Sequence, residues 1–100
     1  MAGLTDRVWV RAHEEESGPV RVYRPEGHPL PAARGREGLT FHDDGRFEYR
    51  PPGRAGAAGA EQGTWHATSD GVRVDVAGQT IPMRITEVGD DVLRLVWPQT

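Results

Sequence analysis

Short runs of alternating apolar and polar residues, separated by turn-forming residues, constrain the fold of this chain most. Residues 39–42 and 46–49 flank Asp43-Asp44-Gly45, and setting Phe41 opposite Phe47 makes the glycine the third residue of a three-residue loop. A glycine there suits the left-handed residue that follows a type I turn in such hairpins. Alternation with a period of two is typical of half-buried strands. The middle of the chain is therefore predicted to form an antiparallel hairpin, which also sets Leu39 opposite Tyr49.

The last third of the chain continues the same pattern. Turns at residues 69–70, 78–79 and 89 bring most of the large apolar residues onto one face of the sheet. A slip of one residue would move them to the other face, so the pattern restricts the register. The predicted cross-strand pairs are Ala67–Val72, Trp65–Val74, Val76–Ile81, Val74–Met83, Val72–Ile85, Ile85–Leu93, Met83–Leu95 and Ile81–Trp97.

Two further strands are predicted near the start, around Val8 to Val10 and from Val20 to Tyr23. Strands with one apolar face each must close into a barrel or stack as a sandwich to bury that face. The predicted fold class is therefore all-β, an antiparallel up-and-down meander of about 7–8 strands closed into a small barrel.

The length of 100 residues predicts one domain over residues 1–100. Two stretches interrupt the strand pattern. Residues 24–38 carry Pro25, Pro29 and Pro31 with several glycines, and residues 50–62 consist mainly of Gly, Ala and Pro. Both are predicted to be mobile loops, and the first is the expected lid or rim of a site.

Charge and composition favour some classes of protein over others. The formal net charge of −3 argues against a dedicated nucleic-acid binder. No apolar run approaches the roughly 20 residues of a membrane-spanning helix. There is no cysteine, so neither a disulfide framework nor thiolate chemistry is expected. The start lacks the basic and apolar regions of a signal peptide, so the chain is expected to be cytoplasmic. The abundance of Gly, Pro, Ala and Arg resembles that of a GC-rich bacterial coding sequence, so a bacterial source is expected.

No metal or other cofactor is predicted. The four histidines are far apart in the sequence, without the close spacing typical of chelating pairs. The paired aspartates at Asp43 and Asp44 lie at a hairpin tip, where aspartate is favoured for turn formation alone. No nucleophile motif and no phosphate-binding glycine loop is present. The histidines are His13, His28, His42 and His66.

The chain resembles the small lipocalin-like (calycin) β-barrels of bacteria. The residues that carry the resemblance are Val8-Trp9-Val10, the run from Leu39 to Phe47, and Gly63-Thr64-Trp65, which meets the family's Gly-x-Trp signature. At the first strand, Arg7 holds the place of the signature glycine. The resemblance implies an up-and-down barrel with a site for a small apolar or amphipathic ligand.

The predicted ligand contacts combine the barrel interior with the 24–38 loop. Interior aromatic residues would supply apolar contact, although side chains alone often fill barrels of this size. Two arginines flanking Gly35 would clamp a polar group of the ligand, or would instead tie the loop to backbone carbonyls and to Glu37. The predicted contacts are Trp9, Tyr23, Arg34, Arg36, Glu37, Phe41, Trp65 and Met83.

Three functions stay open at this point. The first is a non-catalytic barrel that sequesters a small apolar or amphipathic molecule. The second is an enzyme that promotes cyclisation or isomerisation, with Glu37, His13 or Tyr23 carrying protons. The third is an interaction module that uses a sheet edge or a predicted outer row of cationic side chains. That row consists of His66, Arg73, Arg84 and Arg94.

The end of the chain leaves the oligomeric state open. Trp97 and Pro98 are consistent with sealing the barrel and also with a homodimer contact.

Overall fold

The computed structural model describes residues 3–31, 35–52 and 60–97. These residues form eight β-strands and one short 3-10 helix. In chain order the elements are β1 (Val8–Arg11), η1 (His13–Glu15), β2 (Val20–Pro25), β3 (Gly38–Phe41), β4 (Arg46–Arg50), β5 (Glu61–Ala67), β6 (Gly71–Val76), β7 (Gln79–Val88) and β8 (Leu93–Val96).

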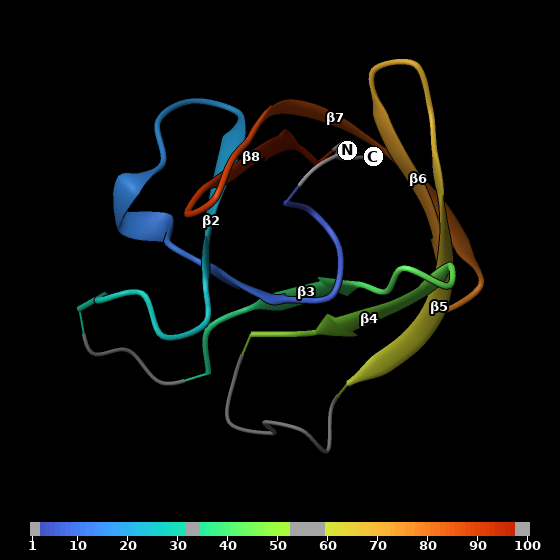
Figure 1. Ribbon diagram of the computed structural model, residues 1–100, viewed down its shortest axis with the longest axis horizontal. Coiled ribbons are helices and arrows are strands. Elements are labelled where there is room, and N and C mark those ends of the chain that lie inside the picture. Colours follow the sequence, from blue (N-terminus) through green and yellow to red (C-terminus); the bar gives the residue numbers. More distant parts are fainter. Residues whose placement is uncertain (1–2, 32–34, 53–59, 98–100) are drawn as a thin grey trace.

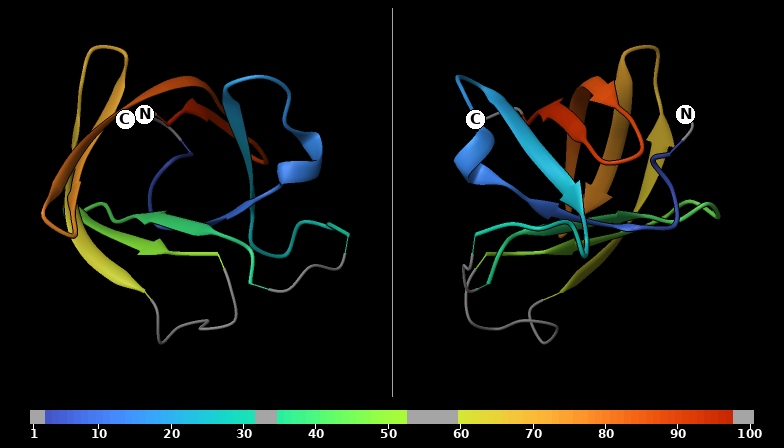
Figure 2. Two further views of the ribbon diagram at one scale, coloured as in Figure 1. Left: turned by 180° about the vertical axis from the view of Figure 1, so that it is seen from behind. Right: turned by 60° about the vertical axis from the view of Figure 1, so that its left-hand side comes forward.

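The eight strands close into one antiparallel barrel in the order β1-β2-β8-β7-β6-β5-β4-β3. Figure 1 shows them arranged around a ring, with the segment before β1 curving across its interior. The predicted fold class is confirmed. From β3 to β8 each strand pairs with the next one in sequence, whereas the β1–β2 hairpin inserts with β1 against β3 and β2 against β8. The connection from β2 to β3 therefore passes β1 at the barrel wall (Figure 2).

Alternate residues of each strand fill the barrel. On β6, Val72 and Val74 are fully buried while Arg73 between them is exposed. A barrel of eight strands is just wide enough for side chains to fill. Near the start of the chain, Leu4 is fully buried and its carbonyl accepts a hydrogen bond from Trp9 Nε1 at 3.0 Å. The N-terminal segment thus covers one end of the barrel with an apolar side chain.

Two predicted registers are confirmed. Phe41 lies opposite Phe47 in the β3–β4 hairpin, and Trp65 lies opposite Val74 between β5 and β6. The loop between β3 and β4 has Gly45 at a φ of 95°, and the Gly45 amide donates to the His42 carbonyl at 3.0 Å. Glycine adopts that backbone conformation without steric cost.

The β6–β7 register differs from the predicted one by two residues. Val74 lies opposite Ile81 instead of Met83. The turn consists of Ala77 and Gly78, with φ values of 53° and 75°, whereas the prediction used Gly78 and Gln79. Two positive φ values define a type I′ turn, which matches the twist of a hairpin. A shift of two residues keeps every side chain on its face, so the apolar pattern does not distinguish the registers.

The β7–β8 register also differs. Ile85 lies opposite Leu95 rather than Leu93, and Val88 lies opposite Leu93. A bulge between Ile85 and Glu87 absorbs the difference in length between the strands. The extra residue shifts the alternation on β7 by one position, so Ile85 and Val88 both pack on the core, whereas the prediction assumed unbroken alternation.

These shifts remove the predicted cationic row. His66 does lie opposite Arg73, as predicted. Arg73, however, lies opposite Pro82, not Arg84. Arg94 lies opposite Glu87, and its Nη1 is 2.8 Å from Glu87 Oε1. The outer wall therefore places an acidic partner where the predicted register placed a like charge.

The two predicted loops are shorter than expected where they are described. β2 extends to Pro25, β3 begins at Gly38 and β5 begins at Glu61. Leu30 packs against a small apolar cluster on the outside of the barrel, formed by Ala12, Val22 and Val92. This part of the predicted lid therefore lies against the wall. The predicted mobility of residues 32–34 and 53–59 falls outside the described residues.

Candidate functional site

A buried carboxylate lies at the end of the barrel opposite the one that Leu4 covers. Glu37 is only 4% exposed, although it immediately precedes β3 and carries a charge. It shares a face with Leu39 and Phe41, because alternate residues of an extended chain point the same way. The strand pattern that fills the core therefore also turns Glu37 inward.

Hydrogen bonds from β2 and β4 converge on this carboxylate, and β1 adds an ion pair. The Tyr23 hydroxyl donates to Oε1 at 2.6 Å and the Tyr49 hydroxyl donates to Oε2 at 2.8 Å. Arg21 Nη1 donates to both oxygens at 3.2 and 3.3 Å. Arg11 Nη1 lies 3.7 Å from Oε1. Buried charges persist in proteins when they are paired and hydrogen-bonded in this way. We call these five residues the Glu37 cluster.

The strand registers explain why these side chains meet. Arg11 lies opposite Tyr23 in the β1–β2 pair, and Arg21 is two residues before Tyr23 on the same face. Tyr49 lies opposite Leu39, which is two residues after Glu37. Closing the barrel through the β1–β3 pair brings these two hairpins together.

Aromatic rings form one wall of the cluster. Trp97 directly follows β8, and the Arg21 guanidinium carbon lies 4.6 Å from the centre of its ring. The rings of Trp97 and Tyr49 lie 5.6 Å apart at an angle of 48°. All three side chains are half-buried. A guanidinium over an indole face is a favourable cation–π arrangement. Trp97 thus helps to seal this end, while Pro98, predicted with it, lies outside the described residues.

The two phenols are held in their protonated form. Burial raises the pKa of Tyr23 and Tyr49 above the ordinary value, and the Glu37 carboxylate raises both further. A neutral hydroxyl next to a carboxylate acts as a hydrogen-bond donor, whereas a phenolate would repel it. The Glu37 carboxylate therefore accepts hydrogen bonds from two neutral tyrosine hydroxyls.

Arg11 connects the Glu37 cluster to the 3-10 turn. Its Nε and Nη2 each donate to Glu16 at 2.8 Å in a two-pronged pair. Burial alone would raise the pKa of Glu16, but the hydrogen bonds from Arg11 and from the Val22 amide hold it below its ordinary value. Formal charges in this region sum to zero, with two arginines against Glu37 and Glu16.

Four predicted ligand contacts lie in the hydrophobic core. Trp9, Phe41 and Met83 have at most 1% of their surface exposed. Phe41 contacts the half-buried Trp65 edge to face, with ring centres 5.6 Å apart. These side chains pack against one another in the barrel interior. Of the predicted contacts, the structure brings together Tyr23 and Glu37.

Arg36, one of the two predicted loop arginines, pairs with Glu14 instead of Glu37. Arg36 forms an ion pair with Glu14 and donates to the backbone carbonyls of Arg11 and Pro31. Arg36 therefore ties the end of the 26–37 connection to the 3-10 turn. Its bonds to backbone carbonyls agree with the alternative in which the loop arginines anchor the loop. Arg34 lies outside the described residues.

Sequence reasoning missed Arg11, Arg21 and Tyr49 as members of this site, whereas Trp97 was considered as a residue that could seal the barrel. A usable signal was present for two of them. Arg21 shares a face with Tyr23, and Tyr49 shares one with Phe47. Arginine at an inward position near a strand end needs a buried partner, so it indicates a nearby carboxylate. The missing information was which strands are neighbours.

Other candidate chemistry has structural roles where it is described. Asp44 caps the β3–β4 turn by accepting from the Arg46 amide at 3.1 Å. His13 is exposed on η1. Within residues 3–31, 35–52 and 60–97, no three His, Asp or Glu side chains gather as a metal site requires. No helix in the same residues has the length and apolarity needed to cross a membrane.

Comparison with known proteins adds no assignment. No protein family, curated protein or solved structure matches this chain. The functional argument therefore rests on the geometry of the Glu37 cluster.

Proposed function

We propose that the protein binds a small amphipathic molecule at the Glu37 end of the barrel. Arg21 would receive the polar head, and the rings of Tyr49 and Trp97 would contact the apolar part. The observation that carries this proposal is the position of Arg21, which spans the buried carboxylate and the half-exposed Trp97 ring. This residue takes the role that the sequence had suggested for Arg34 or Arg36.

The hydrogen bonding of Arg21 supports a role in ligand recognition. Within the described residues, Arg21 donates two side-chain hydrogen bonds of suitable distance and angle. Both come from Nη1 and go to the Glu37 carboxylate. Its Nε and Nη2 make no hydrogen bond within residues 3–31, 35–52 and 60–97, and arginine binds a carboxylate or sulfonate well through paired donors. Because the nearby charges sum to zero, a head with one negative charge fits better than one with two.

The proton-transfer alternative receives less support. The Glu37 oxygens already accept hydrogen bonds from Tyr23, Tyr49 and Arg21, so acting as a base would require the loss of one of them. The raised pKa of both phenols also makes them weak acids near neutral pH.

The interaction-module alternative also receives less support. Each of the eight described strands has two neighbours in the closed barrel, so none of them offers a free edge for strand addition. The outer row of cationic residues that would have served a partner is interrupted at Pro82 and Glu87.

Fluorescence titration with anilinonaphthalene sulfonate tests the proposal, because this probe joins aromatic rings to a single negative charge. We expect saturable binding that decanoate displaces. Arg21→Gln should weaken binding about tenfold or more, since a hydrogen bond to a charged group contributes about 1.5–3 kcal/mol. Arg73→Gln, at an exposed position on β6, is the matched control and should bind normally.

Arg21→Lys separates binding from folding. It keeps a positive charge beside Glu37 but removes the planar paired donors. Weak probe binding by a folded Arg21→Lys protein supports the proposal, and unchanged binding in both Arg21 variants contradicts it. Native mass spectrometry before and after denaturation would show any copurified ligand by its mass.

A further inference from the structure

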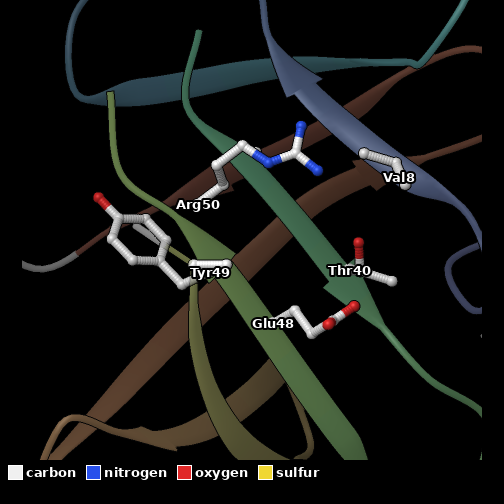
Figure 3. A pocket seen from close by; sticks show the side chains of 7 residues that line it. Val8, Thr40, Glu48, Tyr49 and Arg50 are labelled. Carbon is white, nitrogen blue, oxygen red and sulfur yellow. The ribbon is translucent and has the colours of Figure 1, made fainter. Parts of the chain in front are cut away.

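A small pocket on the outer wall of the barrel is separate from the Glu37 end. It has a volume of about 70 Å³ and lies over β1, β3 and β4. Figure 3 shows Val8, Thr40, Glu48 and Arg50 around it, while the ring of Tyr49 points away from them. The pocket is therefore built from outward-facing residues of strands whose inward-facing residues form the core.

The pocket exists because two outward-facing positions on β3, Gly38 and Thr40, carry small residues between larger neighbours on β1 and β4. Gly38 lies opposite Arg50, and Thr40 lies between Val8 on one side and Glu48 on the other. A Cβ on Gly38 would lie 3.6 Å from the Arg50 Cβ, so the glycine leaves room under the arginine side chain. The Arg50 side chain extends across β3 in Figure 3, which covers one side of the hollow.

Arg50 contributes an unsatisfied donor. Its Nε is buried and has no hydrogen-bond partner among the described residues. Buried donors in folded proteins almost always have a partner, because an unpaired one loses its hydrogen bonds to water without replacement. Since this atom is buried, a ligand oxygen would become its acceptor through a small shift of the Arg50 side chain, which lines the pocket.

Glu48 places an acceptor at the opposite side of the pocket. Its Oε2 lies 2.9 Å from His42 Nε2, and its Oε1 accepts from Gln62 at 2.8 Å. These hydrogen bonds hold the pKa of Glu48 below its ordinary value, so the carboxylate stays charged. The Thr40 hydroxyl, which both donates and accepts, lies between Glu48 and Arg50.

We propose that this pocket binds a small monocarboxylate that carries a hydroxyl or ammonium group. Arg50 holds the carboxylate, while Thr40 and Glu48 accept the hydrogen bond from the second group. A volume of about 70 Å³ is several times the ~10–15 Å³ that one water molecule needs, but it is far below that of a drug-sized site. Glu48 disfavours an anion with two negative charges by repulsion.

The test is an NMR titration that follows the Arg50 Nε–Hε resonance and the Thr40 amide. The probes are glycolate, glycine, acetate and inorganic phosphate. We expect saturable shifts with glycolate and glycine, at least fivefold weaker binding of acetate, and weaker binding still of phosphate. No saturable shift with glycolate or glycine means that water alone occupies the pocket, and this overturns the proposal. Equal binding of all four probes also overturns it, because the second contact would then contribute nothing.

Variants assign the binding to this pocket. Arg50→Gln should abolish the glycolate shifts at Thr40, and Glu48→Gln should reduce the preference for glycolate over acetate. Gly38→Ala is a second variant that should fold, because its Cβ meets only ordinary contacts of 3.5 Å or more, yet it fills part of the hollow. Arg73→Gln is the control and should bind glycolate normally.

The outcome is independent of the proposed function. Arg21→Gln should leave glycolate binding unchanged, and decanoate should not displace glycolate from the pocket. Loss of glycolate binding in the Arg21 variant, with no effect in the Arg50 variant, overturns the assignment to the outer wall.

Discussion

The hydroxyl of Tyr23 lies 2.6 Å from Oε1 of Glu37, and this hydrogen bond joins β2 to the residue before β3 at one end of the barrel. The two residues are adjacent because the β1–β2 hairpin inserts between β3 and β8. The contact therefore bridges the long connection that gives this barrel its strand order.

Removing the Tyr23 hydroxyl should destabilise the protein. Tyr23→Phe leaves a fully buried carboxylate with one donor fewer, and we expect a loss of about 1.5–3 kcal/mol in the free energy of unfolding. Tyr49→Phe removes a similar hydrogen bond at a more exposed position and should cost less. Urea denaturation measures both, and a larger loss for Tyr49→Phe would contradict this view of the cluster.

Alkaline titration should show that neither tyrosine ionises in the folded protein near its ordinary pKa of 10.0. The chain has only these two tyrosines, so tyrosinate absorbance reports on the Glu37 cluster alone. Because the folded pKa lies above the unfolded one, the stability that the tyrosines contribute is complete below pH 10 and falls as the pH rises beyond it. Absorbance at 295 nm should therefore rise together with unfolding, whereas in denaturant it should rise near pH 10. A reversible rise near pH 10 with unchanged circular dichroism would refute the expectation.

Acid titration should show an unusually acidic Glu14. The hydrogen bond from Arg36 lowers its pKa to about 2 from an ordinary value of 4.5. The stability from this pair is present above pH 4.5 and is lost as the pH falls towards 2. Carbon-detected NMR of the carboxyl group measures the midpoint directly. Arg36→Gln should raise it towards 4.5, with the backbone hydrogen bond still holding it somewhat lower, and an unchanged midpoint in that variant would assign the shift to another cause.

Gly63 should not tolerate a side chain. A Cβ at this position would lie 2.1 Å from the carbonyl oxygen of Asp75 on β6, so the two strands would have to separate. We expect Gly63→Ala to lose at least about 1–3 kcal/mol, the usual cost of overpacking. Gly38→Ala is the comparison and should cost much less, because its closest contact is 3.5 Å. Equal thermal unfolding midpoints of the two variants would argue against the β5–β6 approach.

The turn at Ala77 offers a test of the β6–β7 register. Its φ of 53° is a conformation that costs a non-glycine residue about 1–2 kcal/mol, so Ala77→Gly should stabilise the protein. Part of this gain is offset because glycine loses more entropy on folding, which leaves about 0.5–1 kcal/mol. In the register with the turn at Gly78 and Gln79, Ala77 would be a strand residue and the same change would destabilise. Denaturation midpoints decide between the two registers.

The alternating pattern was sufficient to predict the strands, the closed all-β fold and the registers on either side of Asp43-Asp44-Gly45 and Ser69-Asp70. Where two registers place the same side chains inward, as around Ala77, the pattern carried no information. The bulge between Ile85 and Glu87 was missed because the prediction assumed unbroken alternation, although the core-facing apolar residues change from odd to even positions between Ile85 and Val88.

The candidate site was predicted only in part. Tyr23 and Glu37 were selected from the sequence, but the loop arginines were given a role that Arg21 is better placed to fill. Inward-facing Arg21 lies 16 positions from Glu37 in the chain, and nothing local indicates that the two side chains meet. Periodicity reports which face a residue occupies, but it does not report which strands are neighbours.

The sequence by itself determined the side-chain faces of the strands, because a period of two is a local property of an extended backbone. It also determined the turn after His42, where only a residue such as glycine easily adopts a positive φ. The tertiary structure decided which ends of which strands come together around Glu37. It also decided that the β1–β2 hairpin inserts between β3 and β8, because strand order is set by the closure of the whole barrel and not by any one segment.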